Sequence, residues 1–290
     1  MFGLVYKKVA NNFYVKTKSG DFFAVARGNL KTDGIFVGDR VELDIIEHQP
    51  TITCVNERLN QLIRPPLANL EQLIIVIAQV PEPDFMIVDK LILFSLCKGI
   101  KPIIVVNKKD IDKTVGSYVQ KAYKNVAEHI IFTNALTGEG LDELKNVMKG
   151  NLSAFAGQSA VGKSALVNAV MKKHSSEVGE ISIKNQKGKN TTRHCEIFFE
   201  DDIMITDTAG FTSLDEKLLP IAYYELPYYY PDFVAVMDGC KYKSCTHTSE
   251  KKEECAVKRA VLDGLIDKER FLRYKEIYKI LHEKWVKTHG

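Results

Sequence analysis

The sequence predicts a multidomain α/β protein with a small N-terminal β-barrel, a central doubly wound α/β domain and a C-terminal α-helical region. Three observations predict it. Short alternating strand patterns fill residues 2–64, continuous apolar runs alternate with helical patterns from 73 to 206, and a cysteine-rich segment precedes a basic helical stretch at 256–287. We expect the domains to span residues 1–66, 67–215 and 216–290.

The first domain contains five strand-length segments separated by turn residues at 11–12, 19–21, 31–34 and 37–39. Five strands in so short a segment indicate a small closed barrel, either an oligonucleotide-binding (OB) barrel or an SH3-like barrel. Adjacent aromatic residues on a strand point to opposite faces, so some should lie in the core while others remain available to stack on bases. The candidates are Phe13, Tyr14, Phe22, Phe23 and Phe36.

The central domain begins after a linker marked by Pro65 and Pro66. The runs 73–78 and 102–106 are continuously apolar, which is typical of strands in a sheet covered on both faces. Further strands are expected at 130–132, 153–156, 196–199 and 203–206, with helices at 88–97, 114–128, 140–149 and 163–172. This alternation predicts a doubly wound sheet.

Composition narrows the class of protein. A chain of 290 residues that is 45% hydrophobic can form two or three domains with proper cores. It begins without a signal-like segment and has no apolar stretch of bilayer length, so we expect a cytoplasmic protein without a membrane partner. We also expect a monomer. The three parts split at residues 64 and 239 carry net charges of +2, −4 and +5. Basic ends suggest contact with a polyanion, although a solvated lysine-rich helix would look the same.

A glycine-rich segment between the expected strand 153–156 and helix 163–172 has the pattern of a phosphate-binding loop. Backbone amides and the helix N-terminus converge on phosphate oxygens in such a loop, and glycines permit the close approach. Lys163 should reach the β- and γ-phosphates, and Ser164 should ligate Mg²⁺. The residues expected to bind nucleotide here are Gly157, Gln158, Ser159, Ala160, Val161, Gly162, Lys163, Ser164 and Ala165.

A second segment, Asn107, Lys108, Lys109 and Asp110, follows the buried strand 102–106 and indicates which base is bound. Asp110 can accept hydrogen bonds from N1 and the 2-amino group of guanine, an arrangement that adenine does not offer. Asn107 would hold the loop, the stem of Lys108 would cover a ring face, and the Ala135 amide would meet the guanine O6. Together with the phosphate loop, this segment predicts a GTP site.

Two later segments complete the γ-phosphate side of the predicted site. Thr192 lies in a polar stretch and is expected to coordinate Mg²⁺ when GTP is bound. Asp207 follows a buried strand and should bind the metal through water, while the Gly210 amide meets the γ-phosphate. The next residue is Phe211, which cannot orient the attacking water by hydrogen bonding, so slow hydrolysis that awaits an external activator is expected.

These segments occur in a permuted order along the chain, because the base-reading segment precedes the phosphate loop. An ordinary GTPase has the phosphate loop first. The pocket does not depend on chain order, and the permutation leaves residues 207–211 as the last element of the GTPase domain. We therefore hypothesise that loss of the γ-phosphate alters residues 223–260, which follow it.

A third cluster near the C-terminus consists of Cys240, Cys245, His247 and Cys255. Three thiolates and one imidazole within sixteen residues suit a closed tetrahedral Zn²⁺ site. With all four ligands supplied by protein, no position remains for a catalytic water, so we expect one structural zinc ion.

The chain resembles the circularly permuted small ribosomal subunit biogenesis GTPases of the RsgA type over essentially its whole length. The resemblance is carried by residues 26–30 and 37–39 in the barrel, 188–194 and 207–211 in the two switches, and 230–233 and 240–257 near the C-terminus. It implies an OB barrel and a zinc domain that bind 16S rRNA of the 30S ribosomal subunit. It also implies slow GTP hydrolysis stimulated by that subunit and a late role in its maturation, including release of an assembly factor.

Three positions depart from the family pattern. Asn190 stands where the family usually has a histidine proposed to help catalysis, and His194 is a candidate substitute. Ala209 replaces a usual proline, which should loosen the second switch. The spacing from His247 to Cys255 is two residues longer than usual, so a wider loop is expected around residues 249–254. A GTP-regulated switch for another RNA or protein complex remains the alternative function, and a nucleic-acid-binding module with an inactive site is disfavoured by the intact motifs.

Overall fold

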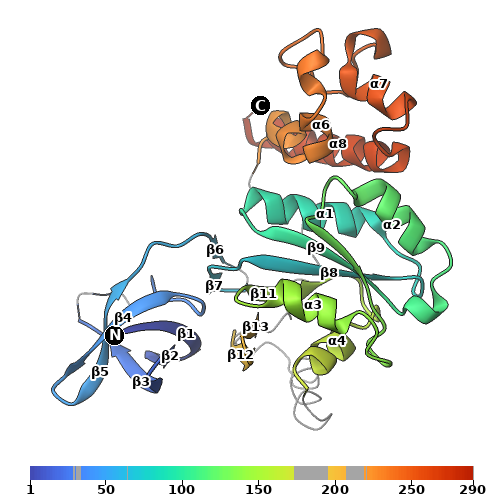
Figure 1. Ribbon diagram of the computed structural model, residues 1–290. Helices are drawn as coiled ribbons and strands as arrows, with labels where there is room; N and C mark the ends of the chain where they lie inside the picture. Colours follow the sequence, from blue (N-terminus) through green and yellow to red (C-terminus); the bar gives the residue numbers. More distant parts are fainter. Residues whose placement is uncertain are drawn as a thin grey trace.

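The computed structural model describes residues 1–28, 30, 34–63, 65–172, 195–206, 219 and 221–289. Figure 1 shows three parts: an N-terminal barrel beside a central sheet, helices on both faces of that sheet, and a C-terminal helical layer stacked above one of these faces. The multidomain α/β architecture predicted from the sequence is confirmed.

The barrel consists of β1 (Phe2–Val9), β2 (Asn12–Thr17), β3 (Gly20–Ala26), β4 (Arg40–Ile46) and β5 (Gln49–Val55). The strands close in the order β1-β2-β3-β5-β4, with β3 parallel to β5 and β4 pairing back onto β1. This arrangement is the OB barrel rather than its SH3-like rival. Phe13 is fully buried in the barrel core, whereas the adjacent Tyr14 is half-buried and pairs across the strands with Phe23, which is 48% exposed, as the alternation of adjacent aromatic residues predicts.

The joint between the barrel and the sheet, which the two prolines mark in the sequence, contains a short two-stranded hairpin. Strands β6 (Gln61–Leu62) and β7 (Leu67–Ala68) pair antiparallel. Leu62 and Leu67 are buried in the same apolar cluster as the sheet. The joint is therefore packed onto the central domain.

The central sheet has six strands in the order β10-β9-β8-β11-β13-β12. They are β8 (Gln72–Ala78), β9 (Lys101–Asn107), β10 (His129–Phe132), β11 (Leu152–Ala156), β12 (Ile197–Glu200) and β13 (Ile203–Thr206). Neighbouring strands are parallel except β12, which pairs antiparallel with β13 at one edge. The carboxyl ends of β9 and β11 therefore lie at one edge of the sheet, where the two predicted nucleotide loops begin.

Helices cover both faces of this sheet, as the continuous apolar strands predict. One face packs on α1 (Phe85–Cys97) and α2 (Val115–Tyr123), and the other on α3 (Leu141–Met148) and α4 (Lys163–Val170). Successive side chains of β8 point to opposite faces of the sheet: Ile75 and Ile77 pack against the first pair of helices, and Ile74 and Val76 pack against the second. The doubly wound arrangement is confirmed.

The C-terminal part contains η4 (Tyr223–Tyr229), α6 (Pro231–Val234), η5 (Met237–Gly239), η6 (Lys252–Glu254), α7 (Ala256–Leu262) and α8 (Lys268–His289). The basic stretch thus forms two helices, separated by residues 263–267. The buried side chains of the C-terminal part, including Phe233 and Tyr274, belong to the same apolar cluster as the α1 face of the sheet. Within the described part of the chain, no helix is both long enough and apolar enough to span a membrane.

The barrel contacts the sheet through the β12–β13 edge (Figure 1). Lys7 of β1 and Glu196 are joined twice: their side chains form an ion pair at 3.0 Å, and their backbones form an isolated β-bridge. The ring of Phe199 receives the edge of Tyr6 at a centroid distance of 5.8 Å, and the Lys16 ammonium lies 4.5 Å from its centre. The hairpin between the two predicted switches therefore faces the barrel.

Candidate nucleotide site and metal cluster

The predicted phosphate loop connects the end of β11 to the start of α4 and requires its glycines. Gly157 has φ +127°, and a Cβ there would lie 2.3 Å from the Val76 carbonyl oxygen. Gly162 has φ +98°, and a Cβ there would lie 2.3 Å from Nδ2 of Asn107. Both values combine a left-handed backbone with a steric clash, so neither position tolerates a side chain. The backbone thus approaches the neighbouring strand and the base-reading loop as closely as it can.

Lys163 opens α4 and folds back over the loop. Its ammonium donates to the carbonyl oxygens of Gly157 at 2.9 Å and Gln158 at 2.7 Å. Burial lowers the pKa of Lys163, because the described residues give its charge carbonyl dipoles but no carboxylate. An anion at this position would restore the preference for the charged form. The neighbouring Ser164 is exposed in the first turn of the helix.

Asn107, at the end of β9, ties the base-reading loop to the phosphate loop. Its side chain is 2% exposed, donates from Nδ2 to the Val161 carbonyl at 3.0 Å, and accepts from the Thr133 hydroxyl at 3.2 Å. Lys108 adds a second tie, because its ammonium donates to the carbonyl oxygens of Ala160 at 2.9 Å and Val80 at 2.8 Å. Residues more than fifty positions apart in the chain thus form one bonded unit.

Asp110 and Ala135, two residues expected to bind the guanine base, are also held by neighbouring side chains. Asp110 is in the short helix η2 (Lys109–Ile111), and its Oδ1 accepts a hydrogen bond from Asn134 Nδ2 at 2.9 Å. The Ala135 amide, expected to meet a guanine O6, donates to Asn107 Oδ1 at 3.2 Å. Lys109 forms an ion pair with Glu139. The loop is therefore preorganised: Asn134 holds Oδ1 of the Asp110 carboxylate, and none of the described residues donates a hydrogen bond to Oδ2.

The γ-phosphate side of the predicted site is only partly described. Thr192, Asp207 and Gly210 lie outside the described residues, as do Asn190, His194 and Phe211. The structure does describe the strand that leads to Asp207. Thr206, its last residue, pairs with Ala154 of β11, two residues before the strand ends and the phosphate loop begins.

The Cys240, Cys245, His247 and Cys255 side chains converge into one cluster. Their ligand atoms all lie within 4.8 Å of one another, and His247 directs Nδ1 toward the sulfurs of Cys255 at 3.4 Å and Cys240 at 3.7 Å. Separations of this size fit the edges of a tetrahedron of thiolate and imidazole ligands around Zn²⁺. The donor set is therefore compatible with zinc.

Backbone amides support the cluster from outside. The Ala256 amide donates to the Cys240 sulfur at 3.3 Å, and the Lys258 amide donates to the Cys255 sulfur at 3.4 Å. Such bonds favour the thiolate form that a metal requires. The Lys258 ammonium donates to the carbonyls of Thr248, at 2.8 Å, and Glu250, which fixes the wide loop between the last two ligands.

A buried ionic cluster that the sequence did not reveal joins the C-terminal part to the central domain. Arg270 of α8 is 1% exposed and pairs with Asp232 of α6 and with Asp89 of α1, and Arg273 also pairs with Asp89. Burial opposes the charge of Arg270, but the carboxylates of Asp232 and Asp89 outweigh it and raise its pKa. The one available signal was Asp89 itself, an acidic residue in an otherwise apolar stretch of helix.

Comparisons with known proteins agree with this geometry. A family model described as RsgA GTPase matches residues 55–217, and one described as 50S ribosome-binding GTPase matches residues 153–285. The chain is 35% identical to the small ribosomal subunit biogenesis GTPase RsgA of Ruminiclostridium cellulolyticum, over 97% of this chain and 94% of that protein. It is 36% identical to the RsgA protein of Geobacillus thermodenitrificans, over 97% and 98% of the two chains.

Solved structures give the same result over nearly the whole length. The crystal structure of YjeQ from Thermotoga maritima matches with a TM-score of 0.80 and 30% identity, covering 97% of this chain and 98% of that one. YloQ, described as a circularly permuted GTPase, matches with a TM-score of 0.80 and 26% identity, covering 98% and 95%. With the permuted motif order, the OB barrel and the cysteine–histidine cluster, these matches show that the chain belongs to the RsgA GTPase family.

Proposed function

We propose that this protein hydrolyses GTP to GDP and phosphate in the pocket formed by the phosphate loop and the base-reading loop. The observation that carries the proposal is their direct bonding: Asn107 to Val161 and Lys108 to Ala160. A lysine-rich surface loop and a glycine turn would have no reason to be joined in this way. The pocket lies at the carboxyl ends of parallel strands, where ligands bind in doubly wound sheets.

Each residue of the pocket has a role set by its chemistry. Asp110 accepts from the guanine N1 and 2-amino groups, the stem of Lys108 covers the base, and the amides of residues 157–165 with the Lys163 ammonium hold the phosphates. Ser164 and Thr192 would hold Mg²⁺, which neutralises charge on the phosphates, with Asp207 acting through water and the Gly210 amide on the γ-phosphate. The Ala135 amide would exchange its bond to Asn107 for one to guanine O6.

We further propose that hydrolysis is slow until a partner activates it, since Phe211 supplies no hydrogen bond to the attacking water. The relatives named RsgA are small ribosomal subunit biogenesis GTPases, which supports the 30S subunit and its 16S rRNA as the partner. The OB barrel and the basic C-terminal part are suited to contact RNA. In this proposal the protein acts as a cytoplasmic monomer late in 30S maturation and helps to release an assembly factor.

The C-terminal cluster is proposed to hold one structural Zn²⁺ through Cys240, Cys245, His247 and Cys255. All four ligands come from the protein, so the ion would stabilise the fold and leave no position for reaction. We also propose the domain limits 1–66, 67–215 and 216–290, with the last two packed on a shared core.

A second candidate function is a GTP-regulated switch for another RNA or protein complex. The match of residues 153–285 to a model described as a 50S ribosome-binding GTPase favours the large subunit as that complex. The two functions share the pocket and differ in the particle bound.

Sedimentation with purified ribosomal subunits separates them. The protein, loaded with a non-hydrolysable GTP analogue, is expected to sediment with 30S and not with 50S subunits, and to dissociate when GDP replaces the analogue. Binding should weaken steeply as salt rises from 50 to 200 mM, because phosphate contacts release counterions. Equal or preferred sedimentation with 50S would favour the alternative, and no sedimentation with either particle would remove the ribosomal partner.

A further inference from the structure

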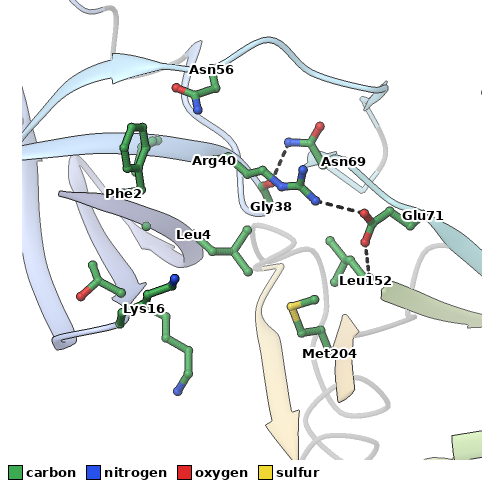
Figure 2. Close-up of a pocket in the computed structure, with 14 residues that line it drawn as sticks. Phe2, Leu4, Lys16, Gly38, Arg40, Asn56, Asn69, Glu71, Leu152 and Met204 are labelled. Carbon is green, nitrogen blue, oxygen red and sulfur yellow. Dashed lines mark hydrogen bonds and ion pairs between the residues drawn. The ribbon is translucent and has the colours of Figure 1, made fainter. Parts of the chain in front are cut away.

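A cavity of about 470 Å³ lies between the barrel and the central domain, on the β12–β13 side of the sheet. Figure 2 shows Phe2, Leu4 and Lys16 of the barrel on one side, Glu71, Leu152 and Met204 of the central domain on the other, and Arg40 between them. Its volume falls in the range of pockets that bind small organic ligands. The cavity is distinct from the GTP pocket, because it shares no residue with the two nucleotide loops.

The walls combine an apolar floor with an exposed aromatic ring. Leu4, Leu152 and Met204 supply the floor, and Phe2, a residue that is 71% exposed, stands at the rim. The Phe2 backbone is held in place by pairing with Glu42 of β4, so the ring is presented from a fixed strand. A fixed exposed aromatic ring beside an apolar surface is the kind of platform on which an unstacked base lies.

The charge of the lining favours an anion. Glu71 is the carboxylate that lines the cavity, and it is already satisfied, because Arg40 donates to one oxygen at 3.0 Å and the Leu152 amide donates to the other at 2.7 Å. Lys16 pairs with Asp21 at 3.8 Å between exposed groups, and its ammonium also lies 4.5 Å from the centre of the Phe199 ring. In the described part of the chain, no carboxylate lies within ion-pair distance of Lys18. Lys18 is therefore available to a phosphate group, and Lys16, whose partners are a distant carboxylate and a ring face, lines the same cavity.

A polar group for the edge of a base is also present. Asn56 follows β5 and lines the cavity, and its side-chain amide makes no hydrogen bond to any residue that the structure describes. An amide can both donate to and accept from a base edge. The other lining amide, Asn69, is engaged at both ends, because its Nδ2 donates to the Gly38 carbonyl and its Oδ1 accepts from the Leu59 amide.

We propose that this cavity binds one unstacked nucleotide of the RNA that the barrel contacts, with the base between Phe2 and the Met204 floor and its phosphate near Lys16 and Lys18. The inference rests on the proposed function for the identity of the RNA. Apolar walls, an aromatic rim, an available amide and the two lining lysines together fit a nucleotide better than they fit a lipid tail or a protein side chain.

The test compares 30S binding by the full-length protein, loaded with a non-hydrolysable GTP analogue, for three variants. Phe2→Ala removes the platform, and Asn56→Trp fills the cavity from a partly exposed position. Ile45→Ala is the control, because Ile45 is 53% exposed on β4 of the same barrel and does not line the cavity. Phe2→Ala and Asn56→Trp should each weaken 30S binding by about fivefold or more, the loss expected for one stacked base, while Ile45→Ala stays within twofold of wild type.

A second arm distinguishes an RNA nucleotide from a free one. With the GTP pocket filled by the analogue, uridine, cytidine and adenosine monophosphates are titrated while the Met204 methyl resonance is followed. If that resonance shifts and the 30S affinity of both variants equals that of wild type, the site takes a free nucleotide and the proposal is overturned. Wild-type 30S affinity in both variants without any shift also overturns it. Failure of the wild type to bind 30S instead refutes the proposed function.

Discussion

Asn107 shows at the scale of one residue how the pocket is organised. The Asn107 side chain bonds to Val161 of the phosphate loop, to Thr133 after β10 and to the Ala135 amide, which is expected to meet the guanine. The close approach of Gly162 to its Nδ2 leaves no space for a Cβ. The residue types and their roles could be predicted from the sequence motifs. The hydrogen bonds could not, because they join positions that are 26 to 54 residues apart in the chain, and a motif does not show which distant residues come together in the fold.

Asp110→Asn tests the assignment of the base at this scale. The amide cannot accept hydrogen bonds from both guanine groups, and charge-assisted hydrogen bonds contribute about 1.5–3 kcal/mol, so GTP affinity should fall by about tenfold to 150-fold. Titration with a fluorescent GTP analogue measures this affinity. Asp142→Asn, at an exposed position in the first turn of α3, is the matched control and should bind like wild type. An Asp110→Asn protein with GTP affinity within twofold of wild type would show that Asp110 does not read the base.

At the scale of elements, the order of strands and helices was predictable and the packing between them was not. Continuous apolar runs identify β8 and β9, and the glycine-rich motif places the start of α4. The β6–β7 hairpin was missed because its two-residue strands are too short for a periodic pattern. The two-helix ending was missed, although residues 263–267 contain no basic residue and begin with Asp263 and Gly264, a typical turn pair.

The buried ionic cluster between α1, α6 and α8 gives a prediction about stability. Removing one member leaves an uncompensated buried charge, which typically costs about 3–5 kcal/mol. Asp89→Ala should therefore lower the free energy of unfolding of the central and C-terminal parts by that amount, measured by chemical denaturation. Glu276→Gln, on an exposed position of α8, should change it by less than about 0.5 kcal/mol. If Asp89→Ala lowers the free energy of unfolding by less than about 1 kcal/mol, Asp89 does not stabilise the two buried arginines in the way proposed here.

The cysteine–histidine cluster gives a second prediction at this scale. Elemental analysis should find about one zinc ion per chain, and Cys255→Ser should lose it, because a closed site depends on all four ligands. A strong chelator should lower the melting temperature of the wild-type protein and have little effect on the Cys255→Ser variant. A fully folded protein purified without zinc, with an unchanged melting temperature in chelator, would contradict a structural metal.

At the scale of the whole molecule, the two flanking parts are attached to the central domain in different ways. The C-terminal helices share its apolar core and the buried arginines. The barrel contacts the β12–β13 hairpin through partly exposed groups such as Lys7 and Glu196, and of its described residues it adds only Val37, with Leu4 and Tyr6 packed against it, to the same apolar cluster. The sequence indicated three parts but not this difference, since both attachments depend on side chains that meet only after folding.

Hydrogen exchange measures whether the bound nucleotide changes the structure of the C-terminal part. Because residues 223–260 follow the second switch segment in the permuted chain, their exchange should be faster with GDP than with a GTP analogue. Exchange within the barrel core, around Phe13, serves as an internal reference. Identical exchange of residues 223–260 in the two nucleotide states would show that the hypothesised coupling to the C-terminal part is absent.

The central claim is that this pocket hydrolyses GTP and that the 30S subunit activates it. Steady-state GTP turnover with and without purified 30S subunits tests it most directly, with Lys163→Ala as the matched variant. Wild-type turnover should be slow alone and rise by about an order of magnitude or more with 30S. Lys163→Ala should remain folded and lose GTP affinity or turnover under both conditions. An unchanged wild-type rate with 30S would contradict activation, and full turnover by Lys163→Ala would contradict the pocket.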